Sequence, residues 1–132
     1  MDVTMSGSSV REQMTECPHT IGREQSLEKA SAVMREHRIR HLPVLDAGKL
    51  LGILSIRDVH LIETLPDVDP TKVSVEEAMS AEPYAVAPDT PLRDVVATMA
   101  EHKYGSAVVM EHDRVVGIFT TIDALRVLAQ KL

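Results

Sequence analysis

The stretch GILSIRD at residues 52–58 returns almost unchanged as GIFTTID at residues 117–123. In both copies a short apolar run, typical of a strand, leads directly into a hydroxyl residue and then into a helical pattern. Ser55 and Asp58 lie three residues apart, which is the spacing of a helix capping box, and the second copy keeps a threonine and an aspartate at the same places. The stretch therefore predicts a strand that continues straight into a capped helix, twice in one chain.

Each copy also begins with a glycine inside the predicted strand, Gly52 or Gly117. Glycine weakens a strand interior unless some group has to approach the backbone closely at that point. The helix that follows begins with N–H groups that attract anions. One interpretation is an anion or nucleotide site at this turn. The alternative is that the polar side chains act only as helix caps, worth about 1 kcal/mol each, and the two roles are compatible.

The two copies are separated by 117 − 52 = 65 residues, and this one offset aligns both halves of the chain without a gap. A register this consistent indicates an internal duplication. The predicted elements are short helices at 10–14 and 75–79, extended segments at 18–21 and 83–86, main helices at 27–38 and 92–103, hairpins at 42–54 and 107–119, and closing helices at 56–63 and 121–132. Thr90 is the expected N-cap of the second main helix, with Pro91 as its first residue.

Each half therefore reads as strand–helix–strand–strand–helix with a three-stranded sheet, which places the protein in the α+β class. We expect the two sheets to pack together about a pseudo-twofold axis and to make one domain of two halves. The predicted boundaries are a disordered tail at 1–9, a first motif at 10–64, a linker at 65–74 that contains Pro66 and Pro70, and a second motif at 75–132.

Composition limits the classes of function. Lys+Arg 14 against Asp+Glu 20 gives a formal charge of −6, which disfavours nonspecific binding to nucleic acid or to an anionic membrane. No run of 18 apolar residues and no signal-peptide pattern occur, and the single Cys17 fits a reducing compartment, so we expect a cytoplasmic protein. Neither a metal-ligand spacing nor a nucleophile–base set occurs. We therefore expect no metal, no catalytic cofactor and no enzymatic activity.

The repeated motifs also carry a family resemblance. HLPVLD at 41–46 precedes the first GILSIRD, and SAVVME at 106–111 precedes its second copy. From about residue 10 to 131 the chain resembles a pair of cystathionine-beta-synthase (CBS) motifs, a Bateman-type module. The resemblance implies an adenine nucleotide (AMP, ADP or ATP) as regulatory ligand in clefts between the motifs, with S-adenosylmethionine or NAD as alternatives. It also implies a stand-alone sensor of energy or metabolite levels that acts in trans on an unidentified protein.

The resemblance assigns roles to individual residues. It implies that Asp58 and Asp123 hold the ribose and that Ser55 and Thr120 face the phosphate. Arg40 and Arg57 add positive charge beside Asp58, which favours that copy for phosphate, although both arginines are also compatible with plain solvated surface charges. The other residues expected to line the adenine and phosphate ends are Ile21, Ile39, His41, Tyr84, Tyr104, Gly105 and Ser106.

The closing helices carry apolar residues at positions that a lone module would leave exposed. These residues predict a homodimer, which CBS-type pairs commonly form through such helices. A second hypothesis for the function follows from this pattern, namely a homodimerising interaction scaffold that binds no ligand. The residues are Leu61, Ile62, Leu125, Val127 and Leu128.

Overall fold

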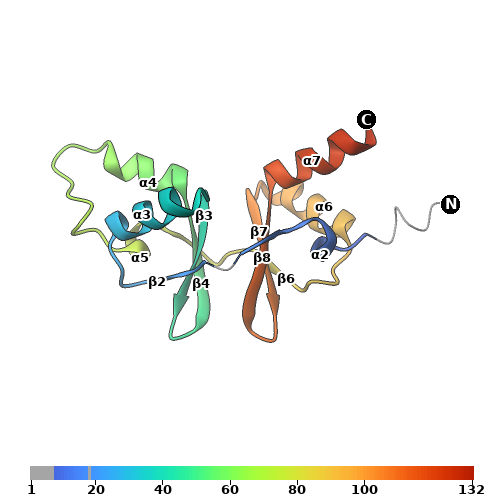
Figure 1. The fold of residues 1–132 in the computed structure, drawn as a ribbon, viewed down its shortest axis with the longest axis horizontal. Coiled ribbons are helices and arrows are strands. Elements are labelled where there is room, and N and C mark those ends of the chain that lie inside the picture. The colour runs from blue at the N-terminus through green and yellow to red at the C-terminus, as the bar shows by residue number, and fades with distance from the viewer. Residues whose placement is uncertain (1–7, 18) are drawn as a thin grey trace. The chain divides into compact units, whose positions relative to one another are not determined.

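The computed structural model describes residues 8–17 and 19–132. The chain divides into two compact units, one made of His19–Pro83 and the other of Met1–Pro18 with Tyr84–Leu132. Six helices and eight strands occur among the described residues, so the predicted α+β class is confirmed (Figure 1). Of the expected tail at 1–9, only residues 8 and 9 are described. The packing of one sheet on the other stays a prediction.

The unit His19–Pro83, called the 19–83 unit below, holds one four-stranded sheet in the order β2-β3-β4-β5. The strand β2 runs parallel to β3, and the other neighbours are antiparallel. Its helices gather on one side of the sheet (Figure 1). Its elements are β2 (Ile21–Gly22), α3 (Leu27–His37), β3 (His41–Asp46), β4 (Lys49–Ser55), α4 (Ile56–Glu63), α5 (Val75–Ala78) and β5 (Ser80–Ala81).

The other unit, called the 84–132 unit, repeats this arrangement with the sheet order β1-β8-β7-β6. Here β6 is parallel to β7, and the other pairs are antiparallel. Its elements are α2 (Val10–Gln13), β1 (Thr15–Glu16), β6 (Ala85–Val86), α6 (Leu92–His102), β7 (Ser106–Glu111), β8 (Arg114–Thr120) and α7 (Thr121–Lys131).

The leading segment of each sequence motif packs in the unit formed by the other motif. The N–H of Val10 donates to the carbonyl of Thr90 at 3.0 Å, and β1 then pairs with β8. In the same way the N–H of Val75 donates to the carbonyl of Gln25 at 2.8 Å, and β5 pairs with β4. Each sheet therefore gains a fourth strand from the other motif, and the prediction of three-stranded sheets was wrong.

The two cores keep the 65-residue offset. Leu27, Met34 and Val44 of the 19–83 unit are buried, and so are their counterparts Leu92, Met99 and Val109. The exchange of leading segments appears here as well, because Val75 completes the first core and Val10 completes the second. Aliphatic burial of this kind supplies roughly 1.5–3 kcal/mol for each large side chain, which explains how a chain with 2% aromatic residues forms two cores.

The strand glycines leave space that other residues of the same chain occupy. A Cβ atom at Gly52 would lie 2.5 Å from Sδ of Met79 and 2.6 Å from the carbonyl oxygen of Ser80 on β5. At Gly117 the nearest group is the side chain of Met14. Both methionines belong to the exchanged leading segments, so the glycines allow these segments to pack against the hairpins. Their close approach therefore gives no support to a ligand at this point.

The start of α6 also differs from the prediction. The helix begins at Leu92, and Pro91 rather than Thr90 is the residue that caps it. Pro91 has no side-chain group that can bond to the first N–H groups, and its φ of −56° with ψ of 133° lies outside the helix. The N–H of Leu92 donates instead to the carbonyl of Ser8 at 2.9 Å, so the chain's leading segment takes over part of the capping.

Candidate functional site

The repeated turn forms a capping box in both units. In the 19–83 unit, Oγ of Ser55 accepts a hydrogen bond from the N–H of Asp58 at 3.1 Å, and Oδ2 of Asp58 accepts from the N–H of Ser55 at 3.1 Å. The N–H of Ile56 donates to the carbonyl of Arg40 at 2.8 Å. Two of the first three N–H groups of α4 are therefore already bonded within the protein, which leaves fewer of them for a phosphate than the sequence implied.

The two aspartates of this turn lie in different surroundings. Asp123 is only 5% exposed, and its Oδ1 accepts from Oγ1 of Thr15 at 3.1 Å and from the guanidinium of Arg126 at 2.9 Å. Its Oδ2 bonds to Thr120. Both carboxylate oxygens of Asp123 are thus occupied.

Asp58 is only half-buried, and its hydrogen bonds go to Ser55 through Oδ2. Within the described residues, its Oδ1 accepts no hydrogen bond. The sequence explains one of the two missing bonds, because the residue that corresponds to Arg126 is Leu61, which has no hydrogen-bond donor in its side chain. The residue that corresponds to Thr15 is Ser80, whose hydroxyl could donate but is not bonded to Asp58. Of the two aspartates, Asp58 is the one that keeps an oxygen available for a ribose hydroxyl.

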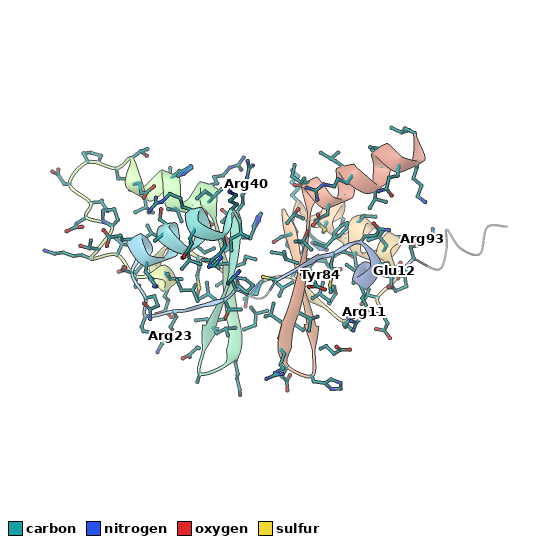
Figure 2. All side chains as sticks on the ribbon, in the orientation of Figure 1. Arg11, Glu12, Arg23, Arg40, Tyr84 and Arg93 are labelled. Atoms are coloured by element: carbon teal, nitrogen blue, oxygen red, sulfur yellow. The ribbon has the colours of Figure 1, made fainter. Side chains whose placement is uncertain are left out.

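The pockets of the 19–83 unit lie along α3 and α4, and some of the predicted site residues line them. A hollow of about 410 Å³ is lined by residues of both helices and of the connection into β3, including Ile39 and Arg40. It shares Arg40, Ile56 and His60 with an open groove that also contains Arg57. Figure 2 shows Arg40 at the end of β3 opposite the hairpin turn. Sequence reasoning missed Ser31, Arg35, Arg38 and His60 in this lining.

The missed residues left a signal in the sequence. Ser31 and Arg35 are four residues apart, which puts them on one face of α3, and Arg38 follows as the residue that ends this helix. Neither arginine has an acidic residue three or four positions away that would pair with it on the helix. An arginine on a helix face without such a partner is a candidate for binding something outside the chain.

In the 84–132 unit the equivalent hollow, about 390 Å³, lies between α6 and α7 and contains Tyr104 and Gly105 of the predicted set. Tyr104 is 40% exposed and stacks on Tyr84, with ring centroids 5.3 Å apart, and on His102 at 5.2 Å. Tyr84 lies close to the start of β6 (Figure 2). Both tyrosines of the chain therefore meet in one place, next to a partly open apolar hollow.

The remaining predicted residues occupy strand positions. The β3–β4 register places His41 opposite Ser55, and the β7–β8 register places Ser106 opposite Thr120. Ile21 is different, because its side chain is 7% exposed and belongs to the core of the 19–83 unit. Ile21 could therefore offer a ligand only its backbone, at the outer edge of β2. The predicted set as a whole divides between the units, with seven residues in the 19–83 unit and six in the 84–132 unit.

Comparison with known proteins places this geometry in a family. The sequence matches the CBS domain over residues 8–61 and again over 75–130, so the chain belongs to the CBS domain family and carries two CBS motifs.

Two relatives illustrate the match. The chain is 32% identical over 111 residues to the CBS domain-containing protein YhcV of Bacillus subtilis (strain 168). The aligned region covers 84% of this chain and 79% of that protein. The chain is also 33% identical over 105 residues to inosine-5'-monophosphate dehydrogenase of Korarchaeum cryptofilum (strain OPF8), covering 79% of this chain but only 21% of the enzyme. The same motif pair therefore occurs as most of one relative and as a small part of another.

Among solved structures, the CBS domain pair of protein MJ0100 superimposes with a TM-score of 0.82 at 28% sequence identity, covering 95% of this chain and 98% of that one. That structure was solved in complex with 5'-methylthioadenosine and S-adenosyl-L-methionine.

The described part of the chain places no three histidine, cysteine or acidic side chains where they could hold a metal ion together. Over the same residues, no helix combines the length and the apolar character that crossing a membrane requires.

Proposed function

We propose that this protein is a regulatory module that binds an adenosine-containing ligand, with AMP, ADP or ATP as the first candidates. The observation that carries the proposal is the strand-to-helix turn of the 19–83 unit, where Asp58 keeps Oδ1 free of hydrogen bonds within the described residues and Arg40 and Arg57 line the neighbouring groove. The free oxygen suits a ribose hydroxyl, and the guanidinium groups suit a phosphate.

The stacked pair Tyr84 and Tyr104 supports a second interaction with an adenosine ligand, the stacking of its base. Bases stack on aromatic rings, and such stacking is worth about 1–3 kcal/mol for each base. Tyr104 is exposed enough to take part, and it is already held against Tyr84. Both oxygens of Asp123 are occupied, and the hydroxyl of Thr120 is already bonded to Asp123. We therefore propose that a ligand of the 84–132 unit would be held chiefly by these rings and by Ser106. The adenosine ligands of the MJ0100 domain pair, a structural neighbour at 28% identity, support this class of ligand.

The experiment is titration calorimetry with AMP, ADP, ATP, NAD, S-adenosylmethionine and 5'-methylthioadenosine. At least one of these ligands should bind to the wild-type chain. Asp58→Ala should weaken that binding by about 10- to 100-fold, because one or two charge-assisted hydrogen bonds are lost. Asp67→Ala, a change of the same kind in the connecting segment, serves as the control and should bind like the wild type.

The alternative is a scaffold that associates through its helices and binds no adenosine ligand. It is favoured by the exposure of Leu61 and Leu125, at 63% and 58%. The absence of binding heat with every one of the six compounds would support the scaffold and reject the ligand proposal. We further propose that the protein is not an enzyme, that it is a cytoplasmic homodimer, and that it acts on a protein partner in trans.

A further inference from the structure

The carboxylate of Asp123 is closed by two groups that come from distant parts of the sequence. Arg126, three residues further along α7, donates from its guanidinium to Oδ1 at 2.9 Å. Thr15, on β1 of the leading segment, donates from Oγ1 to the same oxygen at 3.1 Å. Oδ2 forms the capping box with Thr120. The cap uses only Oδ2, so the two bonds to Oδ1 have no part in starting the helix.

The duplication shows that the strand-to-helix turn forms without these two bonds. Asp58 builds the same capping box through its Oδ2, and α4 begins there with no donor to Oδ1 among the described residues. Leu61, the counterpart of Arg126, has no donor to offer. The bonds to Oδ1 of Asp123 therefore have a consequence beyond the turn itself, which is that they occupy an oxygen that the first copy leaves open.

An occupied carboxylate oxygen is a poorer acceptor for a ligand. A ribose hydroxyl that approaches Oδ1 of Asp123 has to replace both protein donors, so it gains only the difference between the old hydrogen bonds and the new one. The Asp123 side chain is 5% exposed, whereas that of Arg126 is 68% exposed. An ion pair with one member in solvent contributes little to stability. The arginine can therefore be removed, or displaced, without the loss of a large stabilising term.

We infer that Arg126 and Thr15 block the ribose position of the 84–132 unit, so that each chain has one open adenosine site and one that its own side chains hold closed. The inference deepens the proposed function, and it rests on that function for the class of ligand. It makes Arg126 the residue that sets the difference in affinity between the two units. Because Thr15 lies on β1, which pairs with β8, a ribose bound to Asp123 would also break a contact of the leading segment.

The test measures the 84–132 unit by itself, through calorimetry with adenosine in the Asp58→Ala background. Adenosine has no phosphate, so the loss of an arginine does not weaken it through charge. Thr15→Val/Arg126→Ala should bind adenosine at least about tenfold more tightly than the background, because the freed Oδ1 can accept a ribose hydroxyl. Arg126→Ala alone should give a smaller gain. Arg93→Ala, which removes an exposed arginine of α6, is the control and should give none.

A second ligand shows whether the gain comes from the ribose hydroxyls. 2',3'-Dideoxyadenosine offers the same base to Tyr104 but lacks both hydroxyls, so its affinity should be the same with and without the two changes. Thr15 and Arg126 are exposed, and valine keeps the strand preference of threonine, so the variant should fold. A cooperative urea transition checks that it does.

The reciprocal change closes the open site. Leu61→Arg places an arginine three residues after Asp58, at an exposed position of α4, as Arg126 follows Asp123. In the otherwise unchanged chain it should weaken the binding of adenosine, in the same direction as Asp58→Ala. Leu65→Arg adds the same charge in the connecting segment and should leave the affinity unchanged.

Three results would overturn the inference. They are no gain in Thr15→Val/Arg126→Ala, an equal gain for 2',3'-dideoxyadenosine, and an unchanged affinity in Leu61→Arg where Asp58→Ala does weaken binding. The proposed ribose contact of Asp58 is judged separately. If Asp58→Ala binds adenosine as tightly as the wild type, that contact fails, while a hydroxyl-dependent gain in the 84–132 unit still supports the block.

Discussion

At the scale of single residues, the two aspartates of the repeated turn show how the same motif acquires different roles. Asp58 and Asp123 form the same capping box with the preceding hydroxyl residue. Only Asp123 is fully enclosed, because Thr15 and Arg126 reach its second oxygen. A carboxylate that is buried and completely bonded stabilises the fold, whereas one that keeps a free oxygen can bind a ligand at little cost.

This contrast predicts different effects on stability. Asp123→Asn should lower the free energy of unfolding by about 2–3 kcal/mol, since it weakens several charge-assisted hydrogen bonds in a buried place. Asp58→Asn should lower it by about 1 kcal/mol or less, the usual value of a cap. Urea denaturation of the two variants under the same conditions measures the difference, and equal losses would contradict the different roles.

At the scale of elements, the two hairpins reach the same packing with different residues. The register of β3 and β4 pairs Leu42 with Leu54, and the register of β7 and β8 pairs Ala107 with Phe119. All four side chains are fully buried. One small and one large residue therefore fill the space that two leucines fill in the other unit. A core tolerates such an exchange because its stability depends on the total volume and shape of the side chains more than on which residues supply them.

A double-mutant cycle on this pair tests the exchange. Phe119→Leu should cost about 1–2 kcal/mol through the cavity it leaves, and Ala107→Leu should cost about 1–3 kcal/mol through overpacking. The two together should cost at least 1 kcal/mol less than the sum, since each corrects the volume error of the other. Thermal or urea unfolding gives the three values. Simple additivity would show that the pair does not share one space.

At the scale of the whole molecule, the exposed apolar residues of the closing helices bear on association. Leu61 of α4 is 63% exposed, and Leu125 and Leu128 of α7 are 58% and 51% exposed. A single exposed leucine needs no explanation, but several on corresponding helices favour a contact with another chain. A second copy of this chain is the partner that the repeat and the family resemblance predict.

We therefore expect sedimentation equilibrium to give twice the mass of one chain. Leu61→Glu/Leu125→Glu should shift the protein towards the monomer, because it places charges where apolar side chains would be buried. Leu65→Glu, a 44% exposed leucine in the connecting segment, is the matched control and should leave the mass unchanged. A wild type that sediments as a monomer at high concentration would exclude the homodimer.

Much of the local structure could be predicted from the sequence. The capped turns at Ser55 and Thr120 form as their spacing implies. The main helices and the hairpins also occur close to their predicted bounds. These features depend on residues that are near one another in the chain, so the pattern contains the interacting partners. The start of α6 could not be predicted, because the group that bonds to the N–H of Leu92 comes from Ser8.

The sequence by itself determined the duplication, the α+β class and the pair of CBS motifs, because a 65-residue repeat and local hydrogen-bonding patterns survive in the order of residues. Only the tertiary structure decided that Val10 joins the second core and Val75 the first, and that Asp123 is enclosed while Asp58 is not. The physical reason is that both leading segments carry the same local pattern and fit equivalent cores, so their placement depends on contacts between distant parts of the chain.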